Sequence, residues 1–380
     1  MTTTKYHPGL FWFALLTAFC TFLLLGLGGL VTSHEAGMSV PDWPNTYGYN
    51  MFLFPVSQWV GGIFYEHSHR LLASAVGLMT TVLAFWLWLK DARSWMHWLG
   101  VAAFLGVVAQ GVLGGLRVTL HLDSLGIYHG TIAQLFFVLT CALALFTSRW
   151  WQNLQTGRAG SPLPADGAHG LSRHSLATAE AARPAEAHLR GLVLATTLLI
   201  FLQLILGATM RHQHAGLAIP DFPLAYGRVW PDTGPDAVAQ YNAQRTPVNG
   251  INTITPFQIE LQLAHRFVAL AILVLVAVCA AQAWRRLGGR NALTKLAAVW
   301  LAVILLQVAL GAATIWFNKA ADVATAHVLI GALALTVGAL WCILAFRPTA
   351  AAAGDRRVEA RPSPGGVTLP GAQPLLAANE

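Results

Sequence analysis

LFWFALLTAFCTFLLLGLGGLV, residues 10–31, is a run without a single charged side chain. A helix that crosses a bilayer needs about 20 mainly apolar residues, because each residue advances about 1.5 Å through a hydrocarbon core about 30 Å thick. Seven further stretches meet that length, at about 70–89, 98–120, 126–147, 190–209, 264–284, 294–317 and 324–346. The sequence therefore predicts an all-α membrane protein with eight transmembrane helices.

The composition supports a lipid environment and predicts an orientation. Apolar residues make up 56% and charged residues only 10% of the 380 residues, whereas about a quarter of a soluble protein is charged. With the N-terminus inside, the inner segments hold 16 of the 23 basic residues and the outer segments hold 7. Positive loops stay on the cytoplasmic side, so we expect both termini in the cytoplasm and the protein in a bacterial-type plasma (inner) membrane. The net charge of +7 then reflects topology and attraction to membrane lipid, not nucleic-acid binding.

The chain repeats itself. Residues 37–44 (GMSVPDWP) match 216–223 (GLAIPDFP), and each segment is followed closely by Tyr-Gly. The His-Arg pair at 69–70 matches 265–266, the segment 110–115 (QGVLGG) matches 307–312 (QVALGA), and His129 matches His327. Each half begins inside and crosses four times. We therefore predict two tandem four-helix bundles related by a pseudo-two-fold axis along the membrane normal.

The repeat also sets the expected domains. Residues 1–151 form the N-terminal four-helix half, and residues 189–348 form the C-terminal half. Between them, 152–188 mix Gly, Ala, Pro, Ser and Arg and predict a cytoplasmic linker. Residues 349–380, rich in Ala, Pro and Gly, predict a disordered cytoplasmic tail.

Four histidines at repeated positions are the candidate ligands. We place His69, His129, His265 and His327 in the first turn or so of spans that descend from the outer face, which puts the two of each half at similar depth. Neutral imidazole is a good iron ligand, so two imidazoles on facing helices can hold one haem. Without a C-x-x-C-H sequence, no covalent haem attachment is indicated. One such histidine alone would more often be an interfacial residue bound to a loop, and copper or zinc is the alternative metal.

The halves differ beside the first histidine. Glu66 lies three residues before His69, on nearly the same helix face, and Gln262 occupies the matching position. We expect proton or cation chemistry in the first half, with a membrane-edge ion pair between Glu66 and Arg70 as the alternative. Arg70 and Arg266 are candidate propionate-binding residues, and snorkelling to the interface is an equal alternative. The prolines around Asp42 and Asp221 predict outer turns that these carboxylates cap.

Five other histidines follow no repeat, and we expect solvated positions on the outer face for them. They are His34, His67, His121, His212 and His214.

Taken together, these features resemble the haem A synthase family over about 10–346. The motifs are Gly-Gly-Leu-Val-Thr-Ser at 28–33 leading into Pro-Asp-Trp-Pro at 41–44, Glu66-x-x-His69-Arg70, His129, His265-Arg266 and His327. The resemblance implies that the N-terminal half receives the substrate haem O near Glu66, His69 and His129. It implies a haem b cofactor ligated by His265 and His327.

The implied activity is that of an oxidoreductase, which oxidises a methyl group of haem O to the formyl group of haem A for terminal oxidase assembly. Glu66 would stabilise positive charge at that methyl or accept a proton as water attacks. Haem O synthase and cytochrome oxidase assembly factors are the implied partners, with an electron acceptor that the sequence does not identify, and a homo-oligomer is compatible. Some members carry a cysteine pair in the outer loops, whereas all four cysteines here fall inside apolar spans, which leaves the route of electrons open.

Two other functions compete with this interpretation. A di-haem b-type membrane cytochrome that transfers electrons to or from quinone explains four histidines equally well, but gives no reason for a carboxylate beside one haem only. A transporter would explain the duplicated bundle, but predicts broken helices and a polar site near the midplane.

Overall fold

The structure is a computed structural model that describes residues 6–155, 173–246 and 253–347. Eight of its helices are long and apolar enough to cross a membrane, which confirms the predicted all-α membrane fold. The described residues contain no β-strand, only two isolated bridges. The spanning helices are α1 (Pro8–Ser33), α2 (Gly61–Lys90), α3 (Ser94–Thr119), α4 (Leu125–Thr147), α6 (Arg173–His212), α8 (Pro256–Leu287), α9 (Ala292–Trp316) and α10 (Ala321–Ala345).

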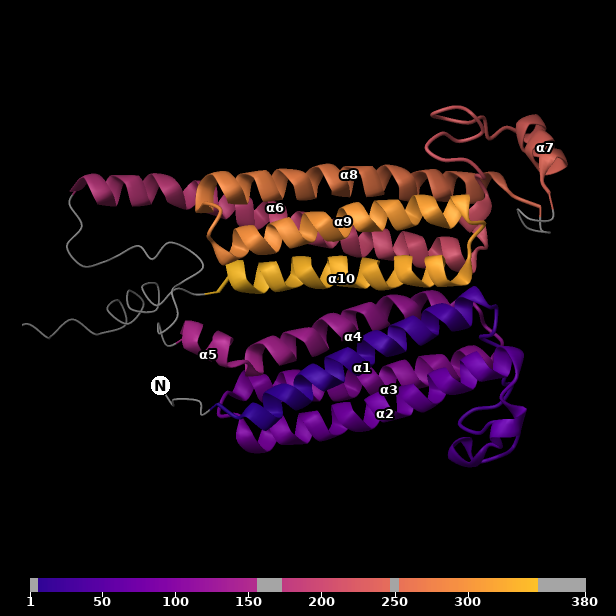
Figure 1. The fold of residues 1–380 in the computed structure, drawn as a ribbon, viewed down its shortest axis with the longest axis horizontal. Coiled ribbons are helices and arrows are strands. Elements are labelled where there is room, and N and C mark those ends of the chain that lie inside the picture. Colours follow the sequence, from indigo (N-terminus) through magenta and orange to yellow (C-terminus); the bar gives the residue numbers. More distant parts are fainter. Residues whose placement is uncertain (1–5, 156–172, 247–252, 348–380) are drawn as a thin grey trace, which may run out of the picture.

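The spanning helices form two groups of four (Figure 1). Helices α1 to α4 pack against one another in the first group, and α6, α8, α9 and α10 do so in the second. Between the groups, α1 contacts α10, α6 contacts α4, and α4 contacts α10. In the repeat, α1 corresponds to α6 and α4 corresponds to α10. Exchanging the halves therefore turns the α1–α10 contact into the α6–α4 contact and leaves the α4–α10 contact unchanged, which is consistent with a two-fold axis. About half of the residues of α4 and α10 are buried, against 17–28% in the other spans, so these two helices form the centre.

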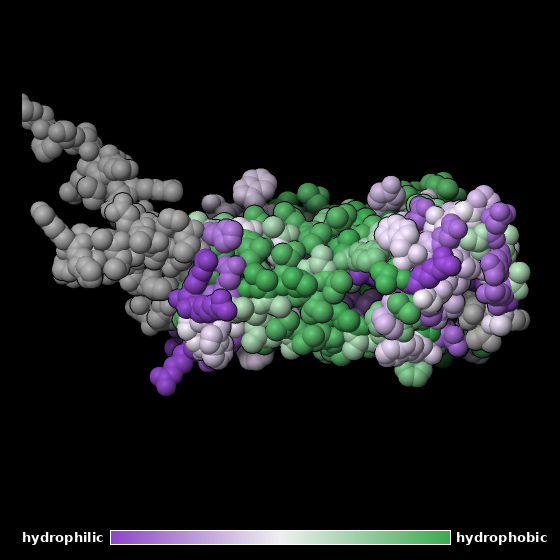
Figure 2. Space-filling view, turned by 90° about the horizontal axis from the view of Figure 1, so that it is seen from above, coloured by the Kyte–Doolittle hydropathy of each residue, from purple (hydrophilic) through white to green (hydrophobic). Residues whose placement is uncertain are grey.

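The surface has the pattern of a membrane protein. A broad apolar band separates two polar ends (Figure 2). Large apolar side chains on the outer helices are exposed, including Leu78 at 67%, Phe85 at 67% and Leu270 at 57%. Within the helices, Thr17 and Thr80 donate their hydroxyl hydrogen bonds to the carbonyl four residues earlier, at 2.8 Å each. Such local bonds satisfy polar side chains that lipid cannot.

Two spans begin earlier than their apolar stretches predict. Helix α2 begins at Gly61 and α8 at Pro256, where the N-cap Thr255 and Gln258 in the first turn form a capping box. A capping box satisfies exposed backbone N–H groups and fixes a helix start. The prediction that the histidines lie within the first turn or so is therefore wrong for His69 and His265, which lie more than two turns inside their helices. The first turns of these helices contain polar residues, so an apolar stretch alone predicts a helix start that is too late.

The remaining described elements are short and lie at the two ends. At the end of the bundle opposite the N-terminus, which we predict to be the outer one, η1 (Met51–Leu53), η2 (Val56–Gln58), η3 (Ala215–Leu217) and α7 (Pro235–Gln244) belong to the loops. Helix α5 (Arg149–Gln155) follows α4 at the end where the N-terminus lies. The proposed linker thus starts within α5 and ends within α6, while its residues 156–172 and the proposed tail from residue 349 onward lie outside the described residues.

Candidate functional site

Each half brings its two predicted histidines together. The ring centroids of His69 (α2) and His129 (α4) are 6.4 Å apart with an interplanar angle of 76°. In the second half, His265 (α8) and His327 (α10) are 6.5 Å apart with an angle of 62°. The two pairs therefore share one geometry, although they come from different parts of the chain.

A glycine on a neighbouring helix packs against each of these histidines. A Cβ added at Gly28 (α1) would lie 3.2 Å from His69 Cε1, and one at Gly207 (α6) would lie 3.2 Å from His265 Cε1. The same holds for Gly114 (α3) against His129 at 3.4 Å and for Gly311 (α9) against His327 at 3.2 Å. These distances are too short for most side chains, so the glycines let each imidazole lie between two helices.

The spacing of the imidazoles fits a metal ion between them. Two imidazoles that would each bind the same metal ion through a nitrogen at about 2 Å would have ring centres up to roughly 6 Å apart. In addition, Nδ1 of His69, His265 and His327 is buried without a hydrogen-bond partner, which is costly for a purely structural histidine. The described residues contain no group of three or more His, Cys, Asp or Glu that could hold a metal ion. A two-imidazole site suits iron in a macrocycle, which supplies its own four nitrogens, better than zinc or copper.

Each second histidine also has a glutamine neighbour. In the orientation that satisfies its bonds, the Gln110 side-chain amide donates to Nδ1 of His129 at 2.9 Å. Gln307 Nε2 lies 3.4 Å from Nε2 of His327. Both glutamines stand at repeated positions of α3 and α9, and this repetition was the signal that could have marked them as part of the site.

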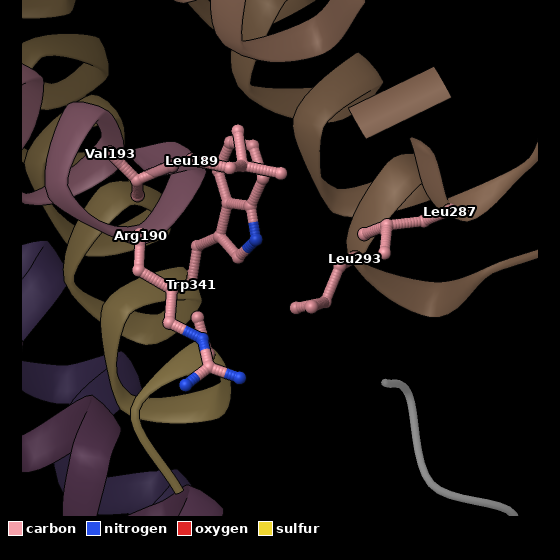
Figure 3. Close-up of a pocket in the computed structure, with 7 residues that line it drawn as sticks. Leu189, Arg190, Val193, Leu287, Leu293 and Trp341 are labelled. Carbon is pink, nitrogen blue, oxygen red and sulfur yellow. The ribbon is translucent and has the colours of Figure 1, made fainter. Parts of the chain in front are cut away.

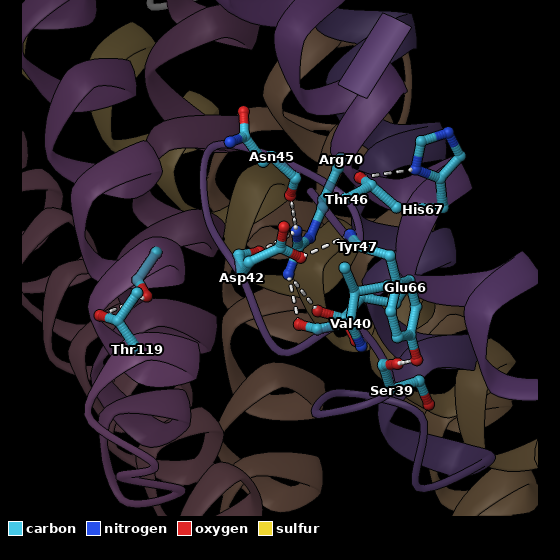
Figure 4. Close-up of polar contacts among 11 residues, drawn as sticks. Ser39, Val40, Asp42, Asn45, Thr46, Tyr47, Glu66, His67, Arg70 and Thr119 are labelled. Atoms are coloured by element: carbon cyan, nitrogen blue, oxygen red, sulfur yellow. Dashed lines mark hydrogen bonds and ion pairs between the residues drawn. The ribbon is translucent and has the colours of Figure 1, made fainter. Parts of the chain in front are cut away.

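Glu66 is buried and lies in a network with the first outer loop (Figure 4). Its Oε2 accepts a hydrogen bond from the Val40 N–H at 2.8 Å, and its Oε1 pairs with Arg70 Nη2 at 2.7 Å. Arg70 also donates to the carbonyls of Val40, Asp42 and Asn45, at 2.9, 2.6 and 3.0 Å. The ion pair that the sequence left as an alternative is therefore present.

The second half builds an equivalent network in which the uncharged Gln262 takes the place of Glu66. Gln262 Oε1 accepts from the Ile219 N–H at 2.6 Å, as Glu66 does from Val40. Arg266 donates to the carbonyls of Leu224 and Asp221, at 2.9 and 2.8 Å. Both arginines thus hold the outer loops, and a role in propionate binding stays a prediction for them.

Asp42 and Asp221 cap the outer loops as predicted. Asp42 accepts hydrogen bonds from the N–H groups of the Tyr-Gly pair at 47–48, both at 2.7 Å, and Asp221 accepts from the pair at 226–227 at 2.7 and 2.9 Å. Tyr47 and Tyr226 have φ of 50° and 52°, a left-handed conformation that is uncommon outside glycine. The carboxylates stabilise this backbone in each loop.

Two outer histidines are not solvated, so that part of the sequence prediction is wrong. His67 is fully buried, packs against Trp59 and lies 3.2 Å from Thr46 Oγ1 through its Nδ1. The side chain of His212 is 8% exposed and contacts Asp123 at 3.1 Å. Neither contact has a signal in the local sequence, because the partners come from a distant loop and from the other half.

A small pocket lies in the second half where α8 and α10 end, away from the histidines (Figure 3). It is lined by Leu189, Val193, Leu287, Leu293 and Trp341, among others. These five side chains are apolar, and Arg190, which carries a guanidinium, and Ala345 complete the lining.

Comparison with known proteins identifies the family of this chain. The family described as "Cytochrome oxidase assembly protein" matches residues 11–339. The chain belongs to this family. Family membership and the eight apolar helices make it an integral, multi-pass membrane protein.

The curated relatives carry the name haem A synthase. A relative from Shouchella clausii is 23% identical over 87% of this chain and 95% of its own length. Relatives from Rhizorhabdus wittichii and Geobacillus kaustophilus are 26% and 25% identical, over 86% and 88% of this chain and 91% of their own lengths in both cases. The likeness therefore spans both halves.

Proposed function

We propose that this protein is a haem A synthase, an oxidoreductase that converts a methyl group of haem O into the formyl group of haem A. The observation that carries the proposal is a pair of equivalent imidazole sites of which only one has a carboxylate, Glu66. Family membership and the names of the relatives support it, and they do not favour a cytochrome that only transfers electrons.

In this proposal the first half receives the substrate and the second half holds the cofactor. His69 and His129 hold haem O, and His265 and His327 hold haem b. The glycines that pack against the imidazoles keep both rings in place, and the outer loops exclude water from above. When bound, haem b supplies one-electron redox chemistry, while the protein supplies ligands, orientation and electrostatics.

Glu66 is the residue that we assign to the reaction. Conversion of methyl to formyl takes up oxygen from water, releases protons and passes electrons to an external electron acceptor, so a fixed negative charge near the reacting carbon favours it. Glu66 lies one helical turn from His69, and Arg70 with the Val40 N–H fixes the carboxylate. Gln262 makes the equivalent loop contact but cannot hold a charge or accept a proton.

The proposed orientation places the histidine pairs and α7 on the outer side of the inner membrane and both termini in the cytoplasm. The excess of Lys and Arg at the opposite end supports it. We also propose the two halves, 1–151 and 189–348, as the functional units.

The test replaces Glu66 with glutamine, the residue at the equivalent position of the second half. Glu66→Gln keeps the acceptor for the Val40 N–H, because Gln262 makes that bond in the second half. In membranes that contain haem O and an electron acceptor, we expect haem A, measured by mass spectrometry of extracted haem, to fall at least about 100-fold, the range typical of general acid–base groups.

The matched control is Gln262→Glu, which should leave conversion within a fewfold of the wild type. Retention of haem b in Glu66→Gln would show that the fold is intact. Haem O that stays unconverted in the wild type, or full conversion by Glu66→Gln, would overturn the proposal.

A further inference from the structure

Arg211 lies beside the second histidine pair. It stands on α6 four residues after Gly207, so both project from nearly the same helix face, and Gly207 is the residue that packs against His265. Its charge is also close enough to interact with His327. A guanidinium therefore lies about one turn to the outer side of the site where the two imidazoles meet.

Its hydrogen bonds cross to the other half and reach only neutral oxygens. Arg211 Nη2 donates to the Gly29 carbonyl at 2.5 Å and to Ser33 Oγ at 2.6 Å, both on α1. Among the described residues, no carboxylate forms an ion pair with Arg211. A guanidinium withdrawn from water is costly without an opposite charge, so this position favours an anionic group.

Three other arginines near the two sites bond to a carboxylate or to loop carbonyls, although Nε of Arg266 is buried without a partner. Lys319 is a further cation on this side of the second site, and its charge is close enough to interact with Arg211. Arg117, near the first pair, forms an ion pair with Asp123 at 2.5 Å. Arg70 and Arg266 donate to the carbonyls of the outer loops. The position equivalent to Arg211 in the first half is Thr32, whose hydroxyl bonds to the Gly28 carbonyl at 3.1 Å. The cation at Arg211 is therefore specific to the second half.

We propose that Arg211 binds a carboxylate of the tetrapyrrole held by His265 and His327. The assignment rests on the proposed function, in which that group is haem b, and it makes Arg211 a positioning residue. A guanidinium and a carboxylate form strong, oriented hydrogen bonds, so Arg211 would turn the acidic edge of the ring toward the outer face. Arg211 also bonds to Gly29 of α1, and the neighbouring Gly28 packs against His69. Arg211 would therefore connect the second site to the helix that contacts the first site.

The test compares haem b with its dimethyl ester, which keeps the iron and the ring but has no free carboxylates. Full-length protein carrying His129→Ala, which leaves only the second histidine pair complete, is prepared from cells starved of haem and titrated with each form by Soret absorption. We expect haem b to bind about 10- to 100-fold more tightly than the ester, the range for a hydrogen bond to a charged group. Arg211→Gln should remove most of this preference, and Arg211→Lys should keep part of it.

Two controls separate carboxylate binding from a structural role. Ser33→Ala removes an oxygen bonded to Arg211 but leaves the charge, so the preference should remain. The midpoint potential of haem b in the otherwise unmutated protein should fall in Arg211→Gln, because a lost cation stabilises the ferric state; helix packing alone predicts no such consistent fall.

The outcomes distinguish this inference from the proposed function. If Arg211→Gln weakens both forms equally, or keeps the full preference, the inference is wrong while the haem site stands. If the unsubstituted Arg211 protein already binds both forms equally, the inference is wrong as well. If it binds neither form, both the inference and the haem assignment fail.

Discussion

The hydrogen-bond networks that join the two outer loops to α2 and α8 share one architecture, but a charged Glu66 in the first network is replaced by a neutral Gln262 in the second. Glu66 and Gln262 accept a hydrogen bond from equivalent backbone N–H groups, of Val40 and Ile219. In both halves an arginine holds the loop carbonyls, and an aspartate caps the following turn. The comparison teaches that the carboxylate of Glu66 is not needed to build the loop, since an amide does so equally well. Its charge is therefore available as a functional difference between the halves.

The strongest way to test the comparison is to remove the ligands of one half at a time. We expect His265→Ala with His327→Ala to abolish the Soret band of protein from cells that make haem b but no haem O, because haem b then lacks both axial ligands. The matched change of His69 and His129 to Ala should leave that band in place and abolish conversion of supplied haem O. Equal loss of the band in both double variants would contradict the separate roles of the halves.

The packing glycines provide a second test. Gly207→Val places side-chain atoms against His265, and we expect haem b content to fall about tenfold, since overpacking costs about 1–3 kcal/mol. Gly28→Val should act on haem O conversion instead, because Gly28 packs against His69. Absorption spectra and haem extraction measure the two effects.

Gly111→Ala is the control for these variants. A Cβ at Gly111 meets no atom within 4 Å, so its haem content should stay at the wild-type level. A similar loss in Gly111→Ala would show that any added bulk, not contact with a histidine, disturbs the sites.

The loop caps should have a smaller effect. Asp42→Ala and Asp221→Ala each remove a carboxylate that accepts two backbone hydrogen bonds, and we expect each to lower stability by about 1–2 kcal/mol. Thermal unfolding in detergent measures this loss. If the loops cover the sites independently, only Asp42→Ala will reduce haem O conversion; a reduction by both variants would show coupling between the halves.

The smallest expected effect concerns the contact between halves at Asp123. Burial opposes ionisation of Asp123, but hydrogen bonds from Arg117 and His212 outweigh it and lower the pKa of its carboxyl below the usual 3.8. A lowered pKa in the folded state stabilises the protein above pH 3.8, and this contribution is lost as the pH falls through the folded-state pKa.

The difference in unfolding temperature between wild type and Asp123→Asn should therefore be constant near neutral pH and shrink below pH 4. Because the Asp123 side chain is 48% exposed, solvent screening keeps the effect below about 1 kcal/mol. A difference that fails to shrink as the pH falls below 4 would contradict this sign.

Much of the candidate site could be predicted from the sequence, because it is repeated. The four histidines and the contrast of Glu66 with Gln262 follow from comparing the halves at matched positions, and the structure brings each histidine pair together. The carbonyl partners of Arg70 were not predictable, since they depend on how the outer loop folds back over α2. Burial of His67 and the contacts of Arg211 were missed for the same reason.

The sequence by itself determined the lipid environment, the eight spans and the residues that repeat. The reason is that the lengths of the apolar stretches and the internal repeat follow from the order of the residues alone. Only the tertiary structure decided which groups meet: His69 with His129, Glu66 with the Val40 N–H, and Arg211 with α1 of the other half. The physical reason is that hydrogen bonds and ion pairs act over a few ångströms between residues up to 292 positions apart, and no local pattern specifies such partners.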